Sequence, residues 1–196
     1  EVMGVRHGYD GLMRGEIMPL NTDSVHDIMQ RGGTILHSAR SKRFETAEGR
    51  EAAAKALKKT TIDSLIVIGG DGSLTGAGLF AAEHALSIIG IPKTIDNDVT
   101  GTDTCIGYDT AVNTAMQALD RIRDTADSHE RMFVIEVMGR DSGYIAYAAG
   151  LAGAADGILI PETTIDWNSL TSVLKERHAG RRGSLLIVVA EGDESG

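Results

Sequence analysis

Short apolar segments of strand length alternate with longer segments that have helical periodicity. The apolar segments are 64–68, 87–91, 132–137, 157–160 and 185–190. They are continuous rather than alternating, which is typical of parallel strands covered on both faces. The helical segments are 22–31, 47–60, 73–85, 108–127, 142–152 and 166–178, with Thr22 or Asp23 as the expected cap of the first and Asp166 as that of the last. This alternation predicts an α/β fold with a largely parallel sheet.

Two motifs lie where predicted strands end, I-G-G-D-G-S at 68–73 and T-I-D-N-D at 94–98. Glycines let backbone N–H groups approach a phosphate, and a helix N-terminus adds a partial positive charge. Asp71 in such a cradle would repel phosphate unless a divalent cation lay between them. Because ligands gather at the carboxyl ends of parallel strands, Asp96 and Asp98 complete a pattern typical of phosphoryl transfer. The alternatives without a catalytic role are a glycine turn at the first motif and an Asp-Asn-Asp turn at the second.

Composition narrows the class of protein. The 196 residues, 42% of them hydrophobic, suffice for one well-buried domain. The net charge of −9 argues against a nucleic-acid or membrane-surface partner. A single cysteine, Cys105, excludes an intramolecular disulfide, and no apolar run approaches the roughly 18 residues of a membrane span. We therefore expect a cytoplasmic protein that binds neither nucleic acid nor membrane.

Further motifs extend the pattern along nearly the whole chain. They are G-G-T-I-L-H-S-A-R at 32–40, G-T-D-T-C-I-G-Y-D-T-A at 101–111, H-E-R at 129–131 and E-V-M-G-R-D-S-G-Y at 136–144. In this order, together with G-G-D-G and T-I-D-N-D, they resemble the 6-phosphofructokinases. The resemblance implies a Rossmann-like three-layer α/β sandwich with mostly parallel sheets in two subdomains.

The resemblance also implies how the chain is divided. It places a nucleotide subdomain at 1–125 and a sugar-phosphate subdomain at 126–196. On composition alone, the charged stretch 123–131 reads as an ordinary solvated helix end. The chain opens in an apparent strand and lacks the family's first glycine-rich loop, so we expect a partial sequence whose second subdomain is incomplete.

A site for the phosphoryl donor is implied in the first part of the chain. Arg40 would stabilise the charge of a loose transition state, and Arg43 follows it into the same region. Asp71 would hold Mg²⁺, which uses one or two carboxylates beside phosphate oxygens. The residues that the resemblance assigns to the donor are Arg40, Ser41, Gly70, Asp71, Gly72 and Ser73.

Asp96 has the role of catalytic base in this resemblance, because a carboxylate must accept the proton as the sugar hydroxyl attacks the γ-phosphorus. Asp98 would orient the site or assist the metal ion through water. Arginines bind phosphate bidentately, and Arg131 is implied to serve a neighbouring subunit of a homodimer or homotetramer. The residues assigned to fructose 6-phosphate are Thr94, Ile95, Asp96, Arg131, Met138, Gly139, Arg140 and Glu191.

Gly72 and Lys93 give opposite indications of the donor. Pyrophosphate-using members of the family typically carry aspartate at the first position and lysine at the second, whereas bacterial ATP-using members have glycine at both. Gly72 leaves room for the nucleotide α-phosphate, so we expect ATP, with pyrophosphate as the alternative. Thr22 stands where allosteric members carry an effector arginine, which argues against the familiar control by ADP or phosphoenolpyruvate.

Some residues receive no catalytic role. Tyr9, His37 and His129 are left unassigned, and Cys105 is expected to pack rather than react. The run 141–147 is expected to be a capped helix start whose N–H groups face the sugar phosphate.

Other classes of protein fit the motifs less well. NAD kinases and diacylglycerol kinases share a G-G-D-G element but lack the later motifs. A non-catalytic phosphosugar-binding protein would be expected to lose Asp71 or Asp96, and both are present. An inactive fragment, whose missing ends complete both sites, remains open. The resemblance therefore implies the activity of an ATP-dependent 6-phosphofructokinase of glycolysis, whose product is fructose 1,6-bisphosphate.

Overall fold

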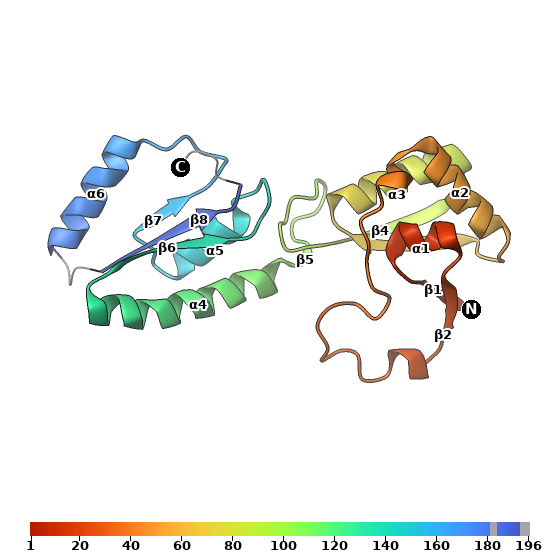
Figure 1. Cartoon of the computed structure of the whole chain (residues 1–196), viewed down its shortest axis with the longest axis horizontal. Coiled ribbons are helices and arrows are strands. Elements are labelled where there is room, and N and C mark those ends of the chain that lie inside the picture. The colour runs from red at the N-terminus through yellow and green to blue at the C-terminus, as the bar shows by residue number, and fades with distance from the viewer. Residues whose placement is uncertain (181–183, 193–196) are drawn as a thin grey trace. The chain divides into compact units, whose positions relative to one another are not determined.

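The computed structural model describes residues 1–180 and 184–192, which fall into two compact units (Figure 1). The first unit contains Glu1–Ile68 and Gly72–Ile91, and the second contains Gly69–Asp71 and Pro92–Gly196. These units are defined by their packing. The division expected between residues 125 and 126 is defined instead by which ligand each part binds, and it stays a prediction.

The elements from β1 to β4 include an antiparallel pair of strands, a second pair of neighbouring strands and three α-helices. In chain order they are β1 Val2–Val5, α1 Gly8–Arg14, β2 Ile17–Leu20, the 3₁₀ helices η1 Asp23–Val25 and η2 Lys42–Glu45, α2 Ala47–Lys58, β3 Ser64–Gly69, α3 Asp71–His84 and β4 Ser87–Thr94. Strands β1 and β2 pair antiparallel, and β3 lies beside β4.

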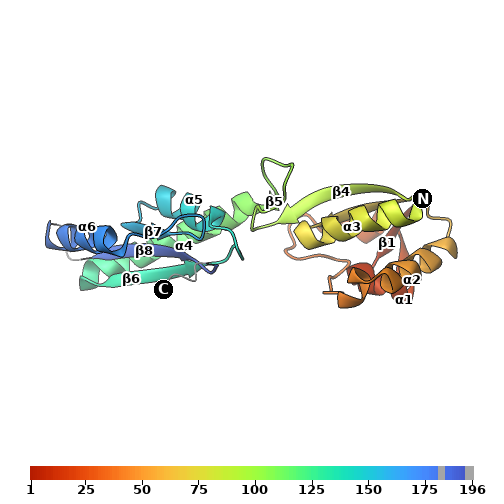
Figure 2. The ribbon, with the colours of Figure 1, turned by 90° about the horizontal axis from the view of Figure 1, so that it is seen from above.

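The first core forms where the three helices meet one face of the β3–β4 sheet. Figure 2 shows α1, α2 and α3 on the same side of β4. Leu12, Phe44, Leu57 and Phe80 are buried there, and their burial favours folding in proportion to the apolar area removed from water. Helix α2 begins at a side-chain cap, because the Thr46 hydroxyl accepts a hydrogen bond from the Gly49 N–H.

The second unit is built on a parallel sheet. Its elements are β5 Ile106–Gly107, which pairs parallel with the end of β4, α4 Tyr108–His129, β6 Met132–Val137, α5 Tyr144–Ala152, β7 Gly157–Leu159, α6 Trp167–Gly180 and β8 Leu185–Ala190. The sheet order is β6-β8-β7, with both pairings parallel. Leu119 of α4, Ala146 and Ala149 of α5, and Val188 of β8 form the second core.

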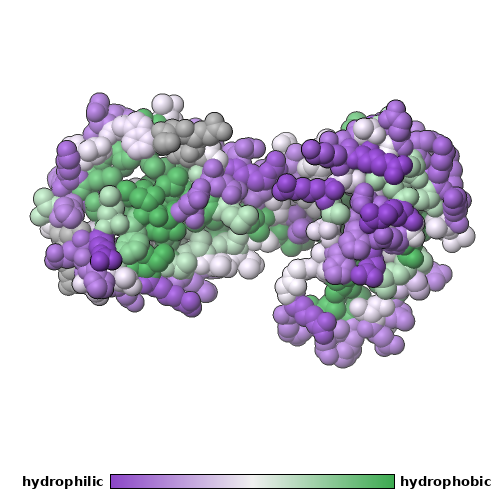
Figure 3. Space-filling model, in the orientation of Figure 1, coloured by the Kyte–Doolittle hydropathy of each residue, from purple (hydrophilic) through white to green (hydrophobic). Residues whose placement is uncertain are grey.

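The predicted strands are found, but their coverage on both faces is confirmed only for β8. This central strand is buried at nearly every position, whereas β3 and β6 alternate between exposed and part-buried residues. Ile66 of β3 and Val134 of β6 are 65% and 61% exposed. Figure 3 shows apolar side chains at the surface in the region of the second unit's sheet. A continuous apolar run therefore did not distinguish a covered face from an open one.

The helix predicted at 22–31 is wrong. Only Asp23–Val25 forms a short 3₁₀ turn, and Met29 is 93% exposed. Neither Thr22 nor Asp23 caps it, because the Asn21 side chain accepts the Ser24 N–H instead. An apolar stripe without a surface to pack on gives a helix little stability.

The remaining predicted helices are confirmed, and shorter elements were missed. The Asp166 carboxylate accepts hydrogen bonds from the Asn168 and Ser169 N–H groups and so caps α6, as expected. Helix α1 and strand β2 had no counterpart in the predicted pattern. Across the described residues, no helix combines the length and the apolar character needed to span a bilayer.

The Asp156 side chain links β8 to α6 through hydrogen bonds. Its carboxylate accepts the Leu186 N–H at 3.0 Å and an Arg177 N–H at 2.9 Å. We predict that Asp156→Ala lowers the free energy of unfolding by about 1–3 kcal/mol, because it leaves a buried donor unpaired. Urea unfolding followed by fluorescence of Trp167, the only tryptophan in the sequence, measures this.

A matched control is Asp124→Ala, which removes an exposed carboxylate from α4 and should cost less than about 0.5 kcal/mol. Equal losses in the two variants would show that the Asp156 hydrogen bonds do not stabilise this unit.

Candidate active site

The turn after β4 presents the aspartates of the T-I-D-N-D motif. The Thr94 hydroxyl donates to Asp96 Oδ2 at 3.1 Å and accepts the Asp96 N–H at 3.2 Å. Asn97 adopts a left-handed backbone conformation with φ of 55°, and its side chain accepts the Cys105 N–H. A turn does form here, but Asn97 supplies its side-chain anchor. The turn is therefore anchored by the Thr94 and Asn97 side chains rather than by the carboxylates of Asp96 and Asp98.

Asp96 is a buried carboxylate with its pKa shifted upward. The residue is 9% exposed. Burial raises the pKa of its carboxyl above the ordinary 3.8, and the negative charges of Asp98 and Glu191 act in the same direction. The hydrogen bond from Thr94 and the positive charge of Arg140 oppose the shift. A carboxylate with a raised pKa is a better proton acceptor than a solvated aspartate.

Ser142 connects this turn to the loop that follows β6. Its hydroxyl donates to the Asp96 carbonyl at 2.6 Å, in a buried position. The same loop passes through Gly139, whose φ is 153° and where a Cβ would lie 2.4 Å from the Ser142 carbonyl oxygen. Only glycine fits this conformation and this approach. The loop thereby carries Arg140 next to the T-I-D-N-D turn.

Arg140 and Glu191 meet in the same place. An Arg140 Nη1 lies 3.6 Å from Asp98 Oδ2, while the buried Asp98 Oδ1 has no hydrogen-bond partner among the residues the structure describes. Glu191, just beyond β8, accepts the backbone N–H groups of Gly139 and Arg140 at 3.1 and 2.6 Å. The ends of β4, β6 and β8 thus bring together an acid pair, an arginine and a third carboxylate.

The helix start expected at 141–147 is confirmed, because α5 begins at Tyr144. The Ser142 hydroxyl donates to the Asp96 carbonyl, and Gly143, the N-cap residue of α5, makes no side-chain cap. Glu162 instead accepts the Gly143 N–H at 2.7 Å. Sequence reasoning missed Glu162, since nothing local marks a carboxylate 19 residues away as the partner of this N–H.

The glycine-rich cradle lies at the start of α3, directly after β3. Gly70 approaches Thr94 closely, because a Cβ at Gly70 would lie 3.4 Å from the Thr94 Cβ. Gly72 has open space around it, and Asp71 is exposed in the first helical turn. Ser73 follows in the same turn, and its carbonyl accepts the Tyr9 hydroxyl at 2.6 Å. Free N–H groups at a helix start suit phosphate.

The segment that carries Arg40 has no regular secondary structure from residue 26 to residue 41. Arg40 is exposed, and the Ser41 hydroxyl lies 3.5 Å from an Asp10 carboxylate oxygen. His37 stacks on His7 with ring centroids 5.3 Å apart.

Other predicted residues lie at the surface. Met138 is 61% exposed, Lys93 and Arg131 are exposed, and the Arg131 carbonyl accepts the Leu185 N–H. Cys105 is 2% exposed, which confirms that it packs. In the described ranges 1–180 and 184–192, no three His, Cys, Asp or Glu side chains form a metal cluster. A single carboxylate such as Asp71 fits a cation carried mainly by phosphate oxygens.

Comparison with known proteins agrees with this geometry. A family model described as Phosphofructokinase matches residues 1–196. The chain is 54% identical over 196 residues to an ATP-dependent 6-phosphofructokinase of Thermotoga neapolitana, and 52% identical over 192 residues to ATP-dependent 6-phosphofructokinase 1 of Thermus thermophilus. The matches cover 100% and 98% of this chain, but only 61% and 60% of those relatives. The chain thus spans about three fifths of the length of the curated relatives it matches.

Solved structures share the fold. A phosphofructokinase from Saccharomyces cerevisiae superposes with a TM-score of 0.92 at 39% identity, over 98% of this chain and 30% of that one. A pyrophosphate-dependent phosphofructokinase from Marinobacter aquaeolei gives 0.79 at 26% identity, over 97% and 52%. These neighbours confirm the predicted α/β fold class.

Charge on Asp96 should destabilise the folded protein. Since its folded-state pKa is raised, ionisation costs folding free energy once the pH exceeds the ordinary value of 3.8, and the cost persists at pH 7. Asp96→Asn removes this charge and can still accept the Thr94 hydrogen bond. We predict a higher Tm than wild type at pH 7, with the difference shrinking as the pH falls towards 4.

Scanning fluorimetry across pH 4–7.5 measures both curves. A Tm for Asp96→Asn that is below the wild-type value at pH 7 would mean that the carboxylate stabilises the folded state, contrary to its environment. Asp103→Asn, at an exposed position on the loop after β4, is the control and should show no such trend.

Proposed function

The chain belongs to the phosphofructokinase family, and from this premise we propose that the protein transfers the γ-phosphoryl group of ATP to the 1-hydroxyl of fructose 6-phosphate. The observation that carries the proposal is the buried Asp96 carboxylate, with its raised pKa, beside Arg140 and Glu191. A proton acceptor, a phosphate-binding cation and a hydroxyl-binding acid are the groups that such a transfer needs. The product is fructose 1,6-bisphosphate.

Asp96 acts as the general base. It accepts the proton of the sugar hydroxyl as that oxygen attacks the γ-phosphorus, and its raised pKa favours the transfer. The Thr94 hydroxyl, 3.1 Å from Asp96 Oδ2, restricts the orientation of the carboxylate. Thr94 and Ile95 lie beside the base and contact the sugar or the transferring phosphoryl group.

Arg140 binds the sugar phosphate, and Met138 and Gly139 bring the backbone against the sugar. The Arg140 pairing with Asp98 is 3.6 Å long and part-exposed, so a phosphate can replace it at modest cost. Glu191 Oε1 holds the loop through two N–H groups, and the carboxylate lies where it can also bind sugar hydroxyls.

Arg131 binds the phosphate of the substrate in a neighbouring subunit. Its exposure at the start of β6 supports this role, because a side chain at the surface is free to reach another chain. We propose a homodimer or homotetramer in the cytoplasm, with no nucleic-acid or membrane partner.

The donor binds at the start of α3 and beside Arg40 and Ser41, at the end of the irregular segment 26–41. Backbone N–H groups of Gly70, Gly72 and Ser73 cradle its phosphates, and Arg40 and Ser41 contact them from the preceding segment. Asp71 holds Mg²⁺, which supplies charge neutralisation of the phosphate oxygens when bound. The exposed position of Asp71 in the first turn of α3 supports this assignment.

ATP is the proposed donor, and pyrophosphate is the second candidate. The open space at Gly72 admits the nucleotide α-phosphate, and the relatives at about 50% identity are named ATP-dependent. The exposed Lys93 is the feature that favours pyrophosphate. The neighbour named pyrophosphate-dependent is only 26% identical.

Replacing the proposed base should strongly lower turnover and leave substrate binding nearly unchanged. We predict that Asp96→Asn lowers kcat by about 10²–10⁴-fold and changes the KM for fructose 6-phosphate only a few-fold, because the amide keeps the shape but accepts no proton. Steady-state kinetics of the full-length enzyme measures both constants. Asp103→Asn is the control, and near-normal turnover of Asp96→Asn would remove Asp96 from this role.

An acid at position 72 should change the donor. Gly72→Asp places a carboxylate near the nucleotide α-phosphate, where like charges about 4 Å apart cost roughly 4 kcal/mol at an effective dielectric of 20. We predict that ATP use falls by about three orders of magnitude, and that pyrophosphate use is kept or appears. Nothing lies within 4 Å of a Cβ at this position, so the fold should tolerate the change.

Gly78→Asp is the matched control, since Gly78 lies on the same helix in equally open space. It should leave the choice of donor unchanged. A wild-type enzyme that turns over pyrophosphate and ignores ATP would show that Lys93 outweighs Gly72 and that the donor proposal is wrong.

A further inference from the structure

Two glutamates hold the loop that joins β6 to α5, residues 138–143. Glu191, just beyond β8, accepts two N–H groups at the start of this β6–α5 loop, at 3.1 and 2.6 Å. Glu162, beyond β7, accepts the Gly143 N–H at the other end of the loop, at 2.7 Å. The resemblance assigns Glu191 to the sugar phosphate, whereas Glu162 has no assigned role.

The order of strands in the sheet explains why both carboxylates reach one loop. Strand β8 lies between β6 and β7, and both pairings are parallel. Val137 and Ala190, the last residues of β6 and β8, are partners in the register, and Leu159 at the end of β7 is opposite Val189. The three strands therefore end at the same edge of the sheet. At this edge one glutamate directly follows β8, and Glu162 follows β7.

A tight turn presents Glu162 to the loop. The Thr163 N–H donates to the Ile160 carbonyl at 3.3 Å, and Pro161 restricts the backbone between them. Gly143 packs directly against this turn, because a Cβ at Gly143 would lie 2.4 Å from the Ile160 Cβ and 2.5 Å from Glu162 Oε2. Glu162 is exposed but Gly143 is buried, so the carboxylate supplies the partner that a buried N–H requires.

The residue before Gly143 connects this hydrogen bond to the proposed base. The Ser142 hydroxyl donates to the Asp96 carbonyl at 2.6 Å, and the Ser142 N–H donates to the Gly139 carbonyl at 3.0 Å. Arg140 belongs to the same short loop and adopts a left-handed backbone conformation with φ of 52°. A shift of the loop at Gly143 would therefore displace the Ser142 hydroxyl and the Arg140 side chain together.

We propose that Glu162 is a positioning residue for phosphoryl transfer to the sugar. It touches no reacting atom. Through the Gly143 N–H it fixes the β6–α5 loop, and the loop in turn fixes Asp96 and Arg140. This inference rests on the proposed function, because it takes Asp96 as the base and Arg140 as the ligand of the sugar phosphate. Small displacements of such groups lower the rate, and disorder in them weakens binding.

Glu162→Ala removes the acceptor of the Gly143 N–H with little risk to folding, because Glu162 is exposed. In the full-length enzyme we expect kcat to fall and the KM for fructose 6-phosphate to rise, each about 3- to 10-fold, the effect of one hydrogen bond. The KM for ATP should not change, because the donor binds at the start of α3. Glu162→Gln keeps an acceptor oxygen and should restore most of both losses. Glu176→Ala, at an exposed glutamate of α6, is the matched control and should change none of these constants.

A second measurement tests whether Glu162 acts through Ser142. Ser142→Ala removes the hydroxyl that donates to the Asp96 carbonyl and should itself lower kcat. If that hydroxyl transmits the effect, Glu162→Ala should lower kcat much less in the Ser142→Ala background than in the wild type. Equal losses of kcat in the two backgrounds would show that the two side chains act independently, contrary to the proposal.

The outcomes separate this inference from the function on which it rests. If the wild-type enzyme phosphorylates fructose 6-phosphate, but Glu162→Ala lowers only the Tm and leaves kcat and the KM for fructose 6-phosphate unchanged, Glu162 is structural only and the inference is wrong. A Glu162→Gln variant as impaired as Glu162→Ala would also contradict it, because the charge and not the hydrogen bond would then be required. If the wild-type enzyme does not phosphorylate fructose 6-phosphate, the proposed function fails, and the inference fails with it.

Discussion

The hydrogen bond from the Ser142 hydroxyl to the Asp96 carbonyl holds the candidate active site together. It is short, buried and spans 46 residues, and it fixes the turn after β4 to the loop after β6. Glu191 completes the arrangement from the end of β8 by accepting two N–H groups of that loop. Breaking either contact would leave a buried or part-buried polar group unsatisfied, which costs more than the bond itself contributes. Asp96 and Arg140 therefore hold their positions without a ligand.

This arrangement concentrates negative charge around one arginine. Asp98 and Glu191 raise the pKa of Asp96 through their negative charges, and Arg140 is the positive charge that opposes them, together with the Thr94 hydrogen bond. The result is a carboxylate that is costly to keep ionised, which is what a proton acceptor requires. The substrates that we propose are anionic, whereas the chain has a net charge of −9. The attraction has to be local, from individual guanidinium groups and helix N-termini, because the overall field is repulsive.

The sequence predicted the strands and the motifs at their ends, because glycines, acids and apolar runs encode local geometry. It failed where the outcome depends on a distant partner. The segment 22–31 has a helical pattern but no core surface to cover, so only Asp23–Val25 forms a turn. The run in β6 looks like that in β8, yet only β8 lies centrally between two strands. Ser142 resembles a helix cap, but the carbonyl it binds is 46 residues away.

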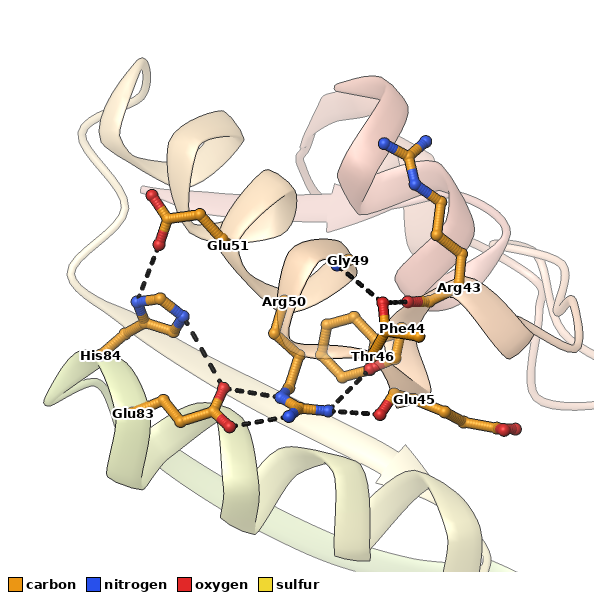
Figure 4. A network of polar contacts seen from close by, with 9 residues as sticks. All are labelled: Arg43, Phe44, Glu45, Thr46, Gly49, Arg50, Glu51, Glu83 and His84. Atoms are coloured by element: carbon orange, nitrogen blue, oxygen red, sulfur yellow. Dashed lines mark hydrogen bonds and ion pairs between the residues drawn. The ribbon is translucent and has the colours of Figure 1, made fainter.

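The two binding sites that we propose owe their order to different physical causes. Around Asp96, strand ends and buried hydrogen bonds fix the backbone. The residues that form this site therefore belong to sequence motifs, and they can be found from the sequence. Around Arg40, residues 26–41 form no regular secondary structure, and the order of the turn that follows comes from the buried guanidinium of Arg50 (Figure 4) and the aromatic stack of Tyr9 on Phe44, which belong to no motif. Arg50 and Tyr9 carry no signal of this role in the sequence, since arginine on a helix and tyrosine after a turn are common surface residues. Only their contacts show that Arg50 binds two carbonyls of the turn and that Tyr9 binds the Ser73 carbonyl, and residues of this kind are found by following hydrogen bonds outward from a motif.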